Sequence, residues 1–109
     1  MEIMVVGAGA MGSAICYFLS KLVNPINLTI VDCEFSQLKI TWKKVHNSNQ
    51  KCSTTIFQHD LSENEHYTSL LKAQDIIISA LPPEQHAQLL ITRLKYKKSL
   101  LSIARPVKN

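Results

Sequence analysis

Hydrophobic residues occur along the chain in short apolar runs that alternate with segments of helical periodicity. Short runs rich in β-branched residues are typical of strands that are buried on both faces of a sheet. Segments with apolar residues three or four positions apart are typical of helices. The pattern predicts five strands, at residues 3–6, 27–31, 53–57, 75–80 and 100–103.

Two helices are predicted in the first half of the chain. Apolar residues with helical spacing begin at Met11 and continue to Leu22. A second helix covers residues 36 to about 45, with Trp42 on its apolar side, and we expect the Trp42 ring in the core. The polar residues 46–51 that follow predict a loop.

Two more helices are predicted in the second half. One begins at Ser62, because Ser62 and Glu65 have the spacing of a capping box. The other follows Pro82 and Pro83, since proline is tolerated in the first turn of a helix. Alternating strands and helices predict right-handed crossovers and a parallel sheet. We therefore expect an α/β fold: a doubly wound, five-stranded parallel sheet in the order 3-2-1-4-5, with helices on both faces.

The length of 109 residues fits one domain. We expect this domain to cover residues 1–104, followed by a short basic tail at residues 105–109. A separate substrate domain does not fit into this length. The first residues do not resemble a signal peptide, and no apolar run reaches the ~20 residues of a membrane span. We expect a soluble cytoplasmic protein without a membrane partner.

The formal net charge of +4 is unevenly distributed. Residues 1–92 carry six basic and eight acidic side chains, whereas residues 93–109 carry six basic and no acidic ones. Such a basic segment fits either a nucleic-acid or membrane patch, or the solvated end of a helix, where cations complement the dipole. Only Tyr96 interrupts it with an aromatic ring, so we expect no nucleic-acid partner.

No metal site, disulfide framework or catalytic constellation is recognised in the sequence. The four histidines and three cysteines have no metal-ligand spacing: His46, His59, His66, His86, Cys16, Cys33 and Cys52. Cys16 is expected to be a buried small hydrophobic residue. Cys33 is interpreted as an inert, partly buried thiol, with a redox-sensitive role as the alternative.

A Gly-x-Gly-x-x-Gly pattern follows the first strand directly and opens the first helix. In that context the first glycine permits a tight turn, the second lets a pyrophosphate approach, and the third lets the helix pack closely. We expect Gly7, Gly9 and Gly12 in these roles. The N–H groups near Ala10 and Met11 would then face phosphate.

Asp32 ends the second predicted strand, twenty positions after Gly12. An acid at this point can accept hydrogen bonds from the adenosine ribose hydroxyls. Its charge would repel a 2′-phosphate, and the next residue is Cys33 rather than arginine, so NAD is favoured over NADP. The alternative is that Asp32 caps the second helix and that the glycine turn belongs to another kind of α/β protein.

These residues together resemble a known family. The segment from Gly7 to Ile15, the strand ending at Asp32, and the sequence Asp-Ile-Ile-Ile-Ser-Ala-Leu-Pro at residues 75–82 look like the dinucleotide-binding half of saccharopine dehydrogenase and lysine 6-dehydrogenase-like proteins. The opening alone is also similar to pyrroline-5-carboxylate reductase, and the Ser-Ala-Leu-Pro ending favours the saccharopine group. The resemblance extends over residues 1 to about 104.

The resemblance implies further contacts with the cofactor. The loop after the fourth strand would line the nicotinamide side, at Ser79, Ala80, Leu81 and Pro82. The end of the third strand would border the adenine, at His59, Asp60 and Leu61.

The resemblance also implies an NAD(P)-dependent hydride transfer at an amino-acid C–N bond, with catalytic side chains in a substrate domain that this chain does not match. No catalytic residue is therefore assigned, and we expect the chain to need a catalytic domain or partner chain. Two alternatives stay open. A lone module of this size also resembles the nucleotide-sensing, homodimeric domains that regulate potassium uptake, and the chain could instead be a truncated, vestigial product.

Overall fold

The computed structural model describes residues 1–22, 26–48, 52–58, 65–81 and 99–102. In chain order the described elements are β1 (Glu2–Val6), α1 (Ala10–Ser20), β2 (Asn27–Asp32), α2 (Phe35–Ser48), β3 (Ser53–Gln58), α3 (Glu65–Lys72), β4 (Ile76–Ser79) and β5 (Ser99–Ser102).

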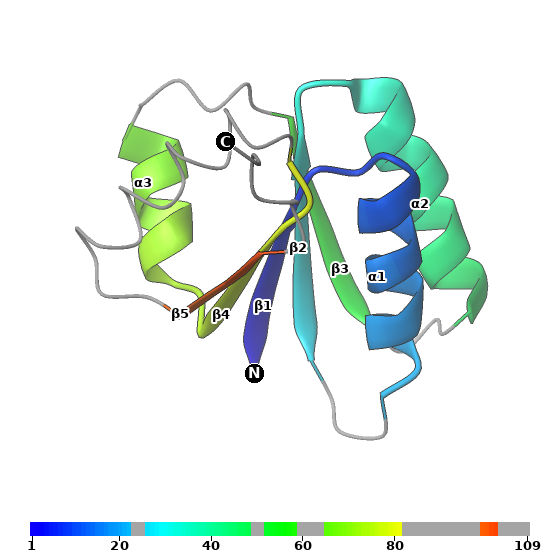
Figure 1. Ribbon diagram of the computed structural model, residues 1–109, viewed down its shortest axis with the longest axis horizontal. Coiled ribbons are helices and arrows are strands. Elements are labelled where there is room, and N and C mark those ends of the chain that lie inside the picture. Colours follow the sequence, from blue (N-terminus) through cyan, green and yellow to red (C-terminus); the bar gives the residue numbers. More distant parts are fainter. Residues whose placement is uncertain (23–25, 49–51, 59–64, 82–98, 103–109) are drawn as a thin grey trace, which may run out of the picture.

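The strands form one parallel sheet in the order β3-β2-β1-β4-β5 (Figure 1). The predicted α/β class, the parallel pairing and the order of the first four strands are confirmed. β5 pairs with β4 from Ile76 opposite Ser99, which is the place expected for the fifth strand. The order reverses between β1 and β4, because β2 and β3 extend the sheet on one side of β1 and β4 extends it on the other.

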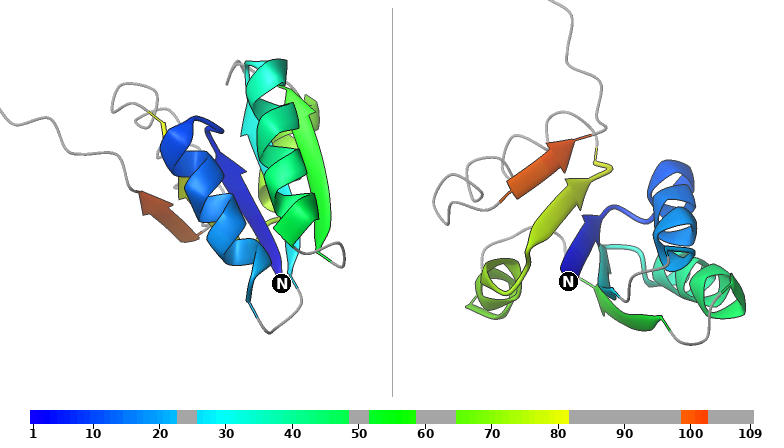
Figure 2. Two further views of the ribbon diagram at one scale, coloured as in Figure 1. Left: turned by 90° about the vertical axis from the view of Figure 1, so that its right-hand side faces the viewer. Right: turned by 90° about the horizontal axis from the view of Figure 1, so that it is seen from below.

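Helices α1 and α2 cover one face of the sheet and α3 covers the other (Figure 2). Side chains alternate along β1, so that Ile3 and Val5 join the core cluster beneath α1 and α2, whereas Met4 and Val6 join the cluster beside α3. Both faces of β1 are therefore buried, as its uninterrupted apolar run indicates. The predicted helix after Pro83, the capping residue Ser62 and the basic residues 93–98 and 105–109 lie outside the described residues.

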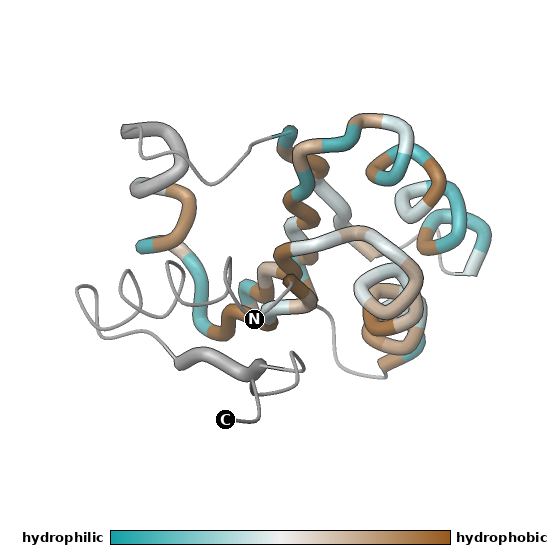
Figure 3. Tube along the Cα trace, turned by 45° about the horizontal axis from the view of Figure 1, so that its top comes forward, coloured by the Kyte–Doolittle hydropathy of each residue, from teal (hydrophilic) through white to brown (hydrophobic). Residues whose placement is uncertain are grey.

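The fully buried side of helix α1 consists of small residues, and the partly buried Ile15 and Leu19 pack against the same core cluster. Its buried residues are Gly12, Ser13, Cys16 and Ser20. Three of the large apolar residues that suggested the helix point outward: Met11 is 62% exposed, Phe18 70% and Leu22 50%. Figure 3 shows that α1 carries hydrophobic residues around much of its circumference, whereas α2 alternates between hydrophilic and hydrophobic positions. The periodicity located the helix, but its fully buried positions are small residues, and of its large apolar residues Ile15 and Leu19 pack against the core.

Helix α2 is longer than its pattern predicted. Leu38, Thr41 and Val45 form its buried side, and the helix continues through Ser48. The loop expected from residue 46 is therefore wrong for residues 46–48. The last turn is fixed by Val45 in the core and by a hydrogen bond of 3.0 Å from the Ser20 hydroxyl to the Ser48 hydroxyl.

The expected core position of Trp42 is also wrong. Its side chain is 37% exposed and stacks on the His46 ring, with ring centroids 4.7 Å apart and an interplanar angle of 9°. Thr41 occupies the inward position instead, and its hydroxyl donates to the carbonyl oxygen of Ala8 at 3.4 Å. A hydrogen bond available to Thr41 satisfies its hydroxyl in the core, and Trp42 loses little by stacking at the surface.

Replacing Leu38 with alanine should destabilise the fold by about 2–5 kcal/mol, because Leu38 is fully buried and the truncation leaves a cavity between α2 and the sheet. Urea unfolding followed by circular dichroism measures the change. The matched control is Ile40→Ala on the same helix, where the side chain is 49% exposed and the expected change is within about 0.5 kcal/mol. Equal losses in the two variants would contradict this orientation of α2.

Candidate functional site

The carboxyl ends of three neighbouring strands are level with one another. Val6 of β1 pairs with Val31 of β2 and with Ser79 of β4. The residues that follow these positions therefore meet at one edge of the sheet, beside the point where the strand order reverses: Gly7, Asp32 and Ala80. Ligands of open α/β sheets bind outside the carboxyl ends of the strands at such a reversal.

The turn after β1 is fixed between the two neighbouring strands. The Gly7 N–H donates to the Val31 carbonyl oxygen at 2.7 Å, and the Ala80 N–H donates to the Val6 carbonyl oxygen at 2.8 Å. Gly7 has a φ angle of +101°, which side chains other than glycine rarely adopt. A Cβ at this position would also lie 3.1 Å from the Ala80 backbone. The turn therefore requires glycine for two independent reasons.

The other two glycines differ in their surroundings. A Cβ on Gly12 would lie only 1.7 Å from the carbonyl oxygen of Gly7, so α1 packs directly against the turn. A Cβ on Gly9 would meet no atom within 4 Å, and Gly9 is exposed. Gly12 thus has the close-packing role that the sequence predicted. Gly9 lies on the open side, where a ligand could approach the backbone.

The N-terminus of α1 has neither a side-chain cap nor an acidic residue in its first turn, and Gly9 is its N-cap residue. The first N–H groups of a helix have no acceptor within the helix, and they carry the positive end of its dipole. Ala10 and Met11, which follow Gly9, are both exposed. This end of α1 has the chemistry required to bind a phosphate, and the roles of Ala10 and Met11 stay predictions.

Asp32 joins the glycine turn to the start of α2. Its Oδ2 accepts a hydrogen bond of 2.6 Å from the Ala8 N–H, and its Oδ1 accepts one of 2.8 Å from the Glu34 N–H. The bond to the Glu34 N–H is an Asx turn that leads into α2, and among the described residues no bond from Asp32 to an N–H of the first turn of α2 supports the capping alternative. The two bonds of Asp32 do not exclude ribose binding, because each carboxylate oxygen has a second acceptor site and Asp32 is only partly buried.

The thiol next to Asp32 is exposed, not partly buried as expected. Partial desolvation raises the pKa of Cys33 above its ordinary value, and the nearby carboxylates of Asp32 and Glu34 raise it further because they disfavour the thiolate. Cys16 is fully buried, as predicted, and burial raises its pKa to about 12.

The residues at the end of β4, Ser79 to Leu81, border the carboxyl edge of the sheet. Ser79 is fully buried, and its hydroxyl accepts a hydrogen bond of 3.5 Å from the Leu81 N–H. Ala80 and Leu81 are partly exposed, and Leu81 packs against the core cluster beside α3. The remaining predicted site residues lie outside the described ranges: His59, Asp60, Leu61 and Pro82.

Two residues that the sequence analysis did not single out donate hydrogen bonds to backbone carbonyl oxygens of the site. Thr41 donates to the Ala8 carbonyl oxygen, and Gln58 Nε2 donates to the Cys33 carbonyl oxygen at 3.1 Å. The signal for Thr41 was a polar residue at a helical spacing between Leu38 and Val45. No local pattern marks Gln58, because its contact with Cys33 depends on the pairing of β3 with β2, in which Gln58 lies opposite Asp32.

The described ranges contain neither a cluster of potential metal ligands nor a helix that could cross a membrane. Residues 1–22, 26–48, 52–58 and 65–81 hold no group of three or more histidine, cysteine, aspartate or glutamate side chains that could bind a metal ion. Within the same part of the chain, no helix has the length and apolar character to cross a membrane.

Comparison with known proteins gives a family match. The model of the saccharopine dehydrogenase NADP-binding domain matches residues 3–104. No curated protein matches the chain in sequence.

Solved structures share the fold at low sequence identity. Saccharopine dehydrogenase (L-Glu forming) from Saccharomyces cerevisiae has a TM-score of 0.78 and 14% identity, over 97% of this chain and 22% of that chain. The Escherichia coli tRNA N6-threonylcarbamoyladenosine dehydratase TcdA has a TM-score of 0.80 and 16% identity, over 93% and 50% of the two chains. Quinate dehydrogenase from Corynebacterium glutamicum in complex with NAD has a TM-score of 0.61 and 20% identity, over 74% and 27%. The chain thus spans between about a fifth and half of these proteins.

Two glycine substitutions should separate folding from ligand approach. Gly12→Ala should lower the free energy of unfolding by several kcal/mol or prevent folding, because its Cβ would overlap the Gly7 carbonyl oxygen. Gly9→Ala should leave it within about 1 kcal/mol of the wild type, since the space around Gly9 is open. Thermal unfolding of both variants measures the difference. A Gly12→Ala protein as stable as Gly9→Ala would contradict the close contact between α1 and the turn.

Thiol reactivity should distinguish Cys33 from Cys16. At pH 8 a disulfide reagent should modify Cys33 in the folded chain, but more slowly than it modifies glutathione, because the raised pKa lowers the thiolate fraction. The rate should increase as the pH rises above 9, and added salt should increase it by screening Asp32 and Glu34. Cys16 should react only on unfolding. Cys33→Ser is the control that separates the modification of Cys33 from that of Cys52. If this variant reacts with the same kinetics as the wild type, the assignment of the reaction to Cys33 is contradicted.

Proposed function

The chain belongs to the family of saccharopine dehydrogenase NADP-binding domains, and on this premise we propose that it binds a nicotinamide dinucleotide at the glycine turn and Asp32, with NAD preferred over NADP. The family makes it an NAD(P)-binding domain of the saccharopine dehydrogenase type. The residues that hold the cofactor and the choice between NAD and NADP are the substance of the proposal.

The observation that carries the proposal is the open position at Gly9 beside an uncapped helix N-terminus. A pyrophosphate there would accept hydrogen bonds from the first N–H groups of α1, at Gly9, Ala10 and Met11. Asp32 is fixed next to this turn through the Ala8 N–H, and its free acceptor sites suit two ribose hydroxyls. The positive end of the α1 dipole thus offsets phosphate charge, and the carboxylate selects a neutral diol.

The flanking contacts in the proposal follow the strand order. Ser79, Ala80, Leu81 and Pro82 would border the nicotinamide, because β4 lies on the far side of β1 from β2. On the opposite side, beyond Asp32, the adenine would be bordered by the segment after β3 and by Cys33, with Asp60 and Leu61 in that segment. A dinucleotide would therefore extend across the carboxyl edge with its pyrophosphate at the centre.

The preference for NAD is supported by the charges around Cys33. Asp32 and Glu34 place carboxylates on both sides of it in the sequence, and residues 32–35 include no lysine or arginine. A 2′-phosphate at this point would meet the negative charge of both carboxylates, and the described cation nearest in sequence is Lys39, which lies over the Phe35 ring. The family is described as NADP-binding, so the proposal makes this chain a variant with altered preference. The NAD complex of quinate dehydrogenase illustrates the same fold with the unphosphorylated cofactor.

For the whole protein we propose an oxidoreductase that acts on an amino-acid C–N bond. When bound, the nicotinamide supplies the hydride transfer. Residues 1–104 position the cofactor in this proposal, and residues 105–109 form a basic tail. The side chains that bind and protonate the substrate belong to a further domain or a partner chain. The match to only 22% of the length of the yeast enzyme supports this division of roles.

The proposal predicts saturable binding of NADH to the purified chain, measured by calorimetry or by cofactor fluorescence. NADPH should bind at least about tenfold more weakly, which corresponds to about 1.4 kcal/mol. Asp32→Asn should weaken NADH binding and narrow the difference between the two cofactors, because it removes the charge that opposes a 2′-phosphate. Gly9→Val should abolish binding while the protein remains folded.

The control variant is Ile40→Ala, which lies on the outer side of α2 and should bind NADH as the wild type does. AMP is the control ligand, and it should compete only weakly because it lacks the second phosphate and the nicotinamide. Absence of saturable binding of either dinucleotide up to millimolar concentration would overturn the proposal. Equal or tighter binding of NADPH would overturn the NAD preference alone.

A further inference from the structure

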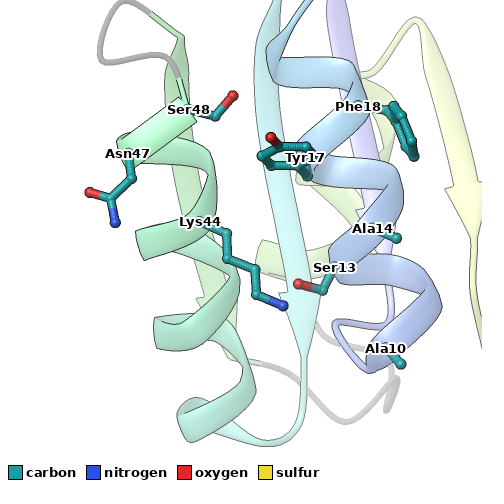
Figure 4. A pocket seen from close by; sticks show the side chains of 8 residues that line it. All are labelled: Ala10, Ser13, Ala14, Tyr17, Phe18, Lys44, Asn47 and Ser48. Carbon is teal, nitrogen blue, oxygen red and sulfur yellow. The ribbon is translucent and has the colours of Figure 1, made fainter.

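A second site lies between the two helices that cover one face of the sheet. An open groove of about 570 Å³ runs between α1 and α2, from Ala10 at the start of α1 to Ser48 at the end of α2 (Figure 4). Its volume lies within the range of small-molecule sites. Of the residues assigned above to the dinucleotide, only Ala10 lines this groove. The groove therefore needs an explanation of its own.

The groove contains a hydroxyl without a partner. Ser13 is 4% exposed, and its Oγ makes no hydrogen bond within the part of the chain that the structure describes. A serine inside a helix ordinarily bonds to a preceding carbonyl oxygen or points to solvent. Here the hydroxyl does neither, and Figure 4 shows it directed toward the end of the Lys44 side chain. An unpaired buried hydroxyl lowers stability unless something bonds to it.

The groove also contains a cation, and none of the residues that line the groove is acidic. Lys44 reaches from α2 toward Ser13 (Figure 4). Neither α1 nor α2 contains an aspartate or a glutamate. The ammonium donates, and the hydroxyl can donate as well as accept; the two groups point toward one another in the groove (Figure 4), so both can donate to one acceptor between them. This pair fits one acceptor group that carries a negative charge.

The rest of the groove is suited to an apolar group. Phe18, which is 70% exposed, and the Tyr17 ring line it together with the methyl groups of Ala10 and Ala14. The two aromatic rings contact each other edge to face, with centroids 6.1 Å apart. Lys44 is the one cation among the lining residues, and Lys21 Nζ lies over the Tyr17 ring, 4.4 Å from its centroid. Exposed aromatic side chains beside cations indicate a ligand with an apolar body and a negatively charged end.

We propose that this groove binds a small organic carboxylate with an aromatic or branched apolar body. The carboxylate accepts hydrogen bonds from Lys44 Nζ and from the Ser13 hydroxyl, and the apolar body covers Tyr17 and Phe18. A carboxylate suits the site better than a phosphate, because the groove offers one cation and carries apolar groups along much of its lining. The inference does not depend on dinucleotide binding.

The test uses benzoate and the neutral, similarly shaped benzamide as probes on the ¹⁵N-labelled chain. Benzoate should shift the amide signals of Ser13, Tyr17 and Ser48 with saturation in the millimolar range, and benzamide should bind at least about tenfold more weakly. Lys44→Met should weaken benzoate binding about tenfold, because it removes a charged hydrogen bond and keeps the length of the side chain. The matched control is Lys43→Met, an exposed neighbour that does not line the groove and should bind benzoate as the wild type does.

Ser13→Ala provides a readout that requires no ligand. It should raise the melting temperature of the free chain, because it removes a buried hydroxyl that has no partner. It should also weaken benzoate binding. The proposal is overturned if benzamide binds as well as benzoate, if Lys43→Met and Lys44→Met have equal effects, or if the folded chain shows no saturable shifts up to about 50 mM benzoate. A lower melting temperature for Ser13→Ala would likewise overturn it, since the hydroxyl would then already be satisfied.

Discussion

The contact between Gly12 and the carbonyl oxygen of Gly7 is the constraint on which the rest of the structure depends. With no Cβ at residue 12, the first turn of α1 lies directly against the turn that follows β1. Such proximity requires small residues along the same side of the helix, and Ser13, Cys16 and Ser20 provide them. Met11 and Phe18 are consequently displaced outward, whereas Ile15 and Leu19 reach the core from the edges of this side. The same contact sets the direction of the α1 N-terminus, and therefore where an anion can bind.

Most of the fold was predictable because its signals are local. A buried parallel strand needs a mainly apolar run; the runs in β1 and β4 are uninterrupted, and that in β2 is interrupted only by the buried Thr29. The glycine turn was also readable, since a positive φ at Gly7 and the lack of space at Gly12 leave no other residue type. Asp32 could be located at the end of β2, but its bonds to the Ala8 and Glu34 N–H groups depend on how two loops meet.

The wrong predictions of which helix side is buried have a common physical cause. Periodicity identifies a helix but does not tell which of its sides faces the sheet when small and large residues both follow the spacing. In α1 the small side is buried, and in α2 Thr41 rather than Trp42 points inward. The hydrogen bond from Thr41 to Ala8 and the stacking of Trp42 on His46 decide the second case. Both interactions join residues whose proximity no single segment of sequence reveals.

The bonds of Asp32 have a thermodynamic consequence. Both carboxylate oxygens are held by backbone N–H groups of the chain itself, so the rotamer of this side chain is already fixed. A ribose that docks on it would not have to immobilise it, and the entropy loss that usually accompanies the ordering of a binding side chain is avoided. The two N–H groups also lie on different segments, the turn after β1 and the start of α2. Any movement of one segment relative to the other would therefore change the orientation of the carboxylate or break one of its two hydrogen bonds. The position of the Asp32 carboxylate is thus coupled to the relative position of these two segments.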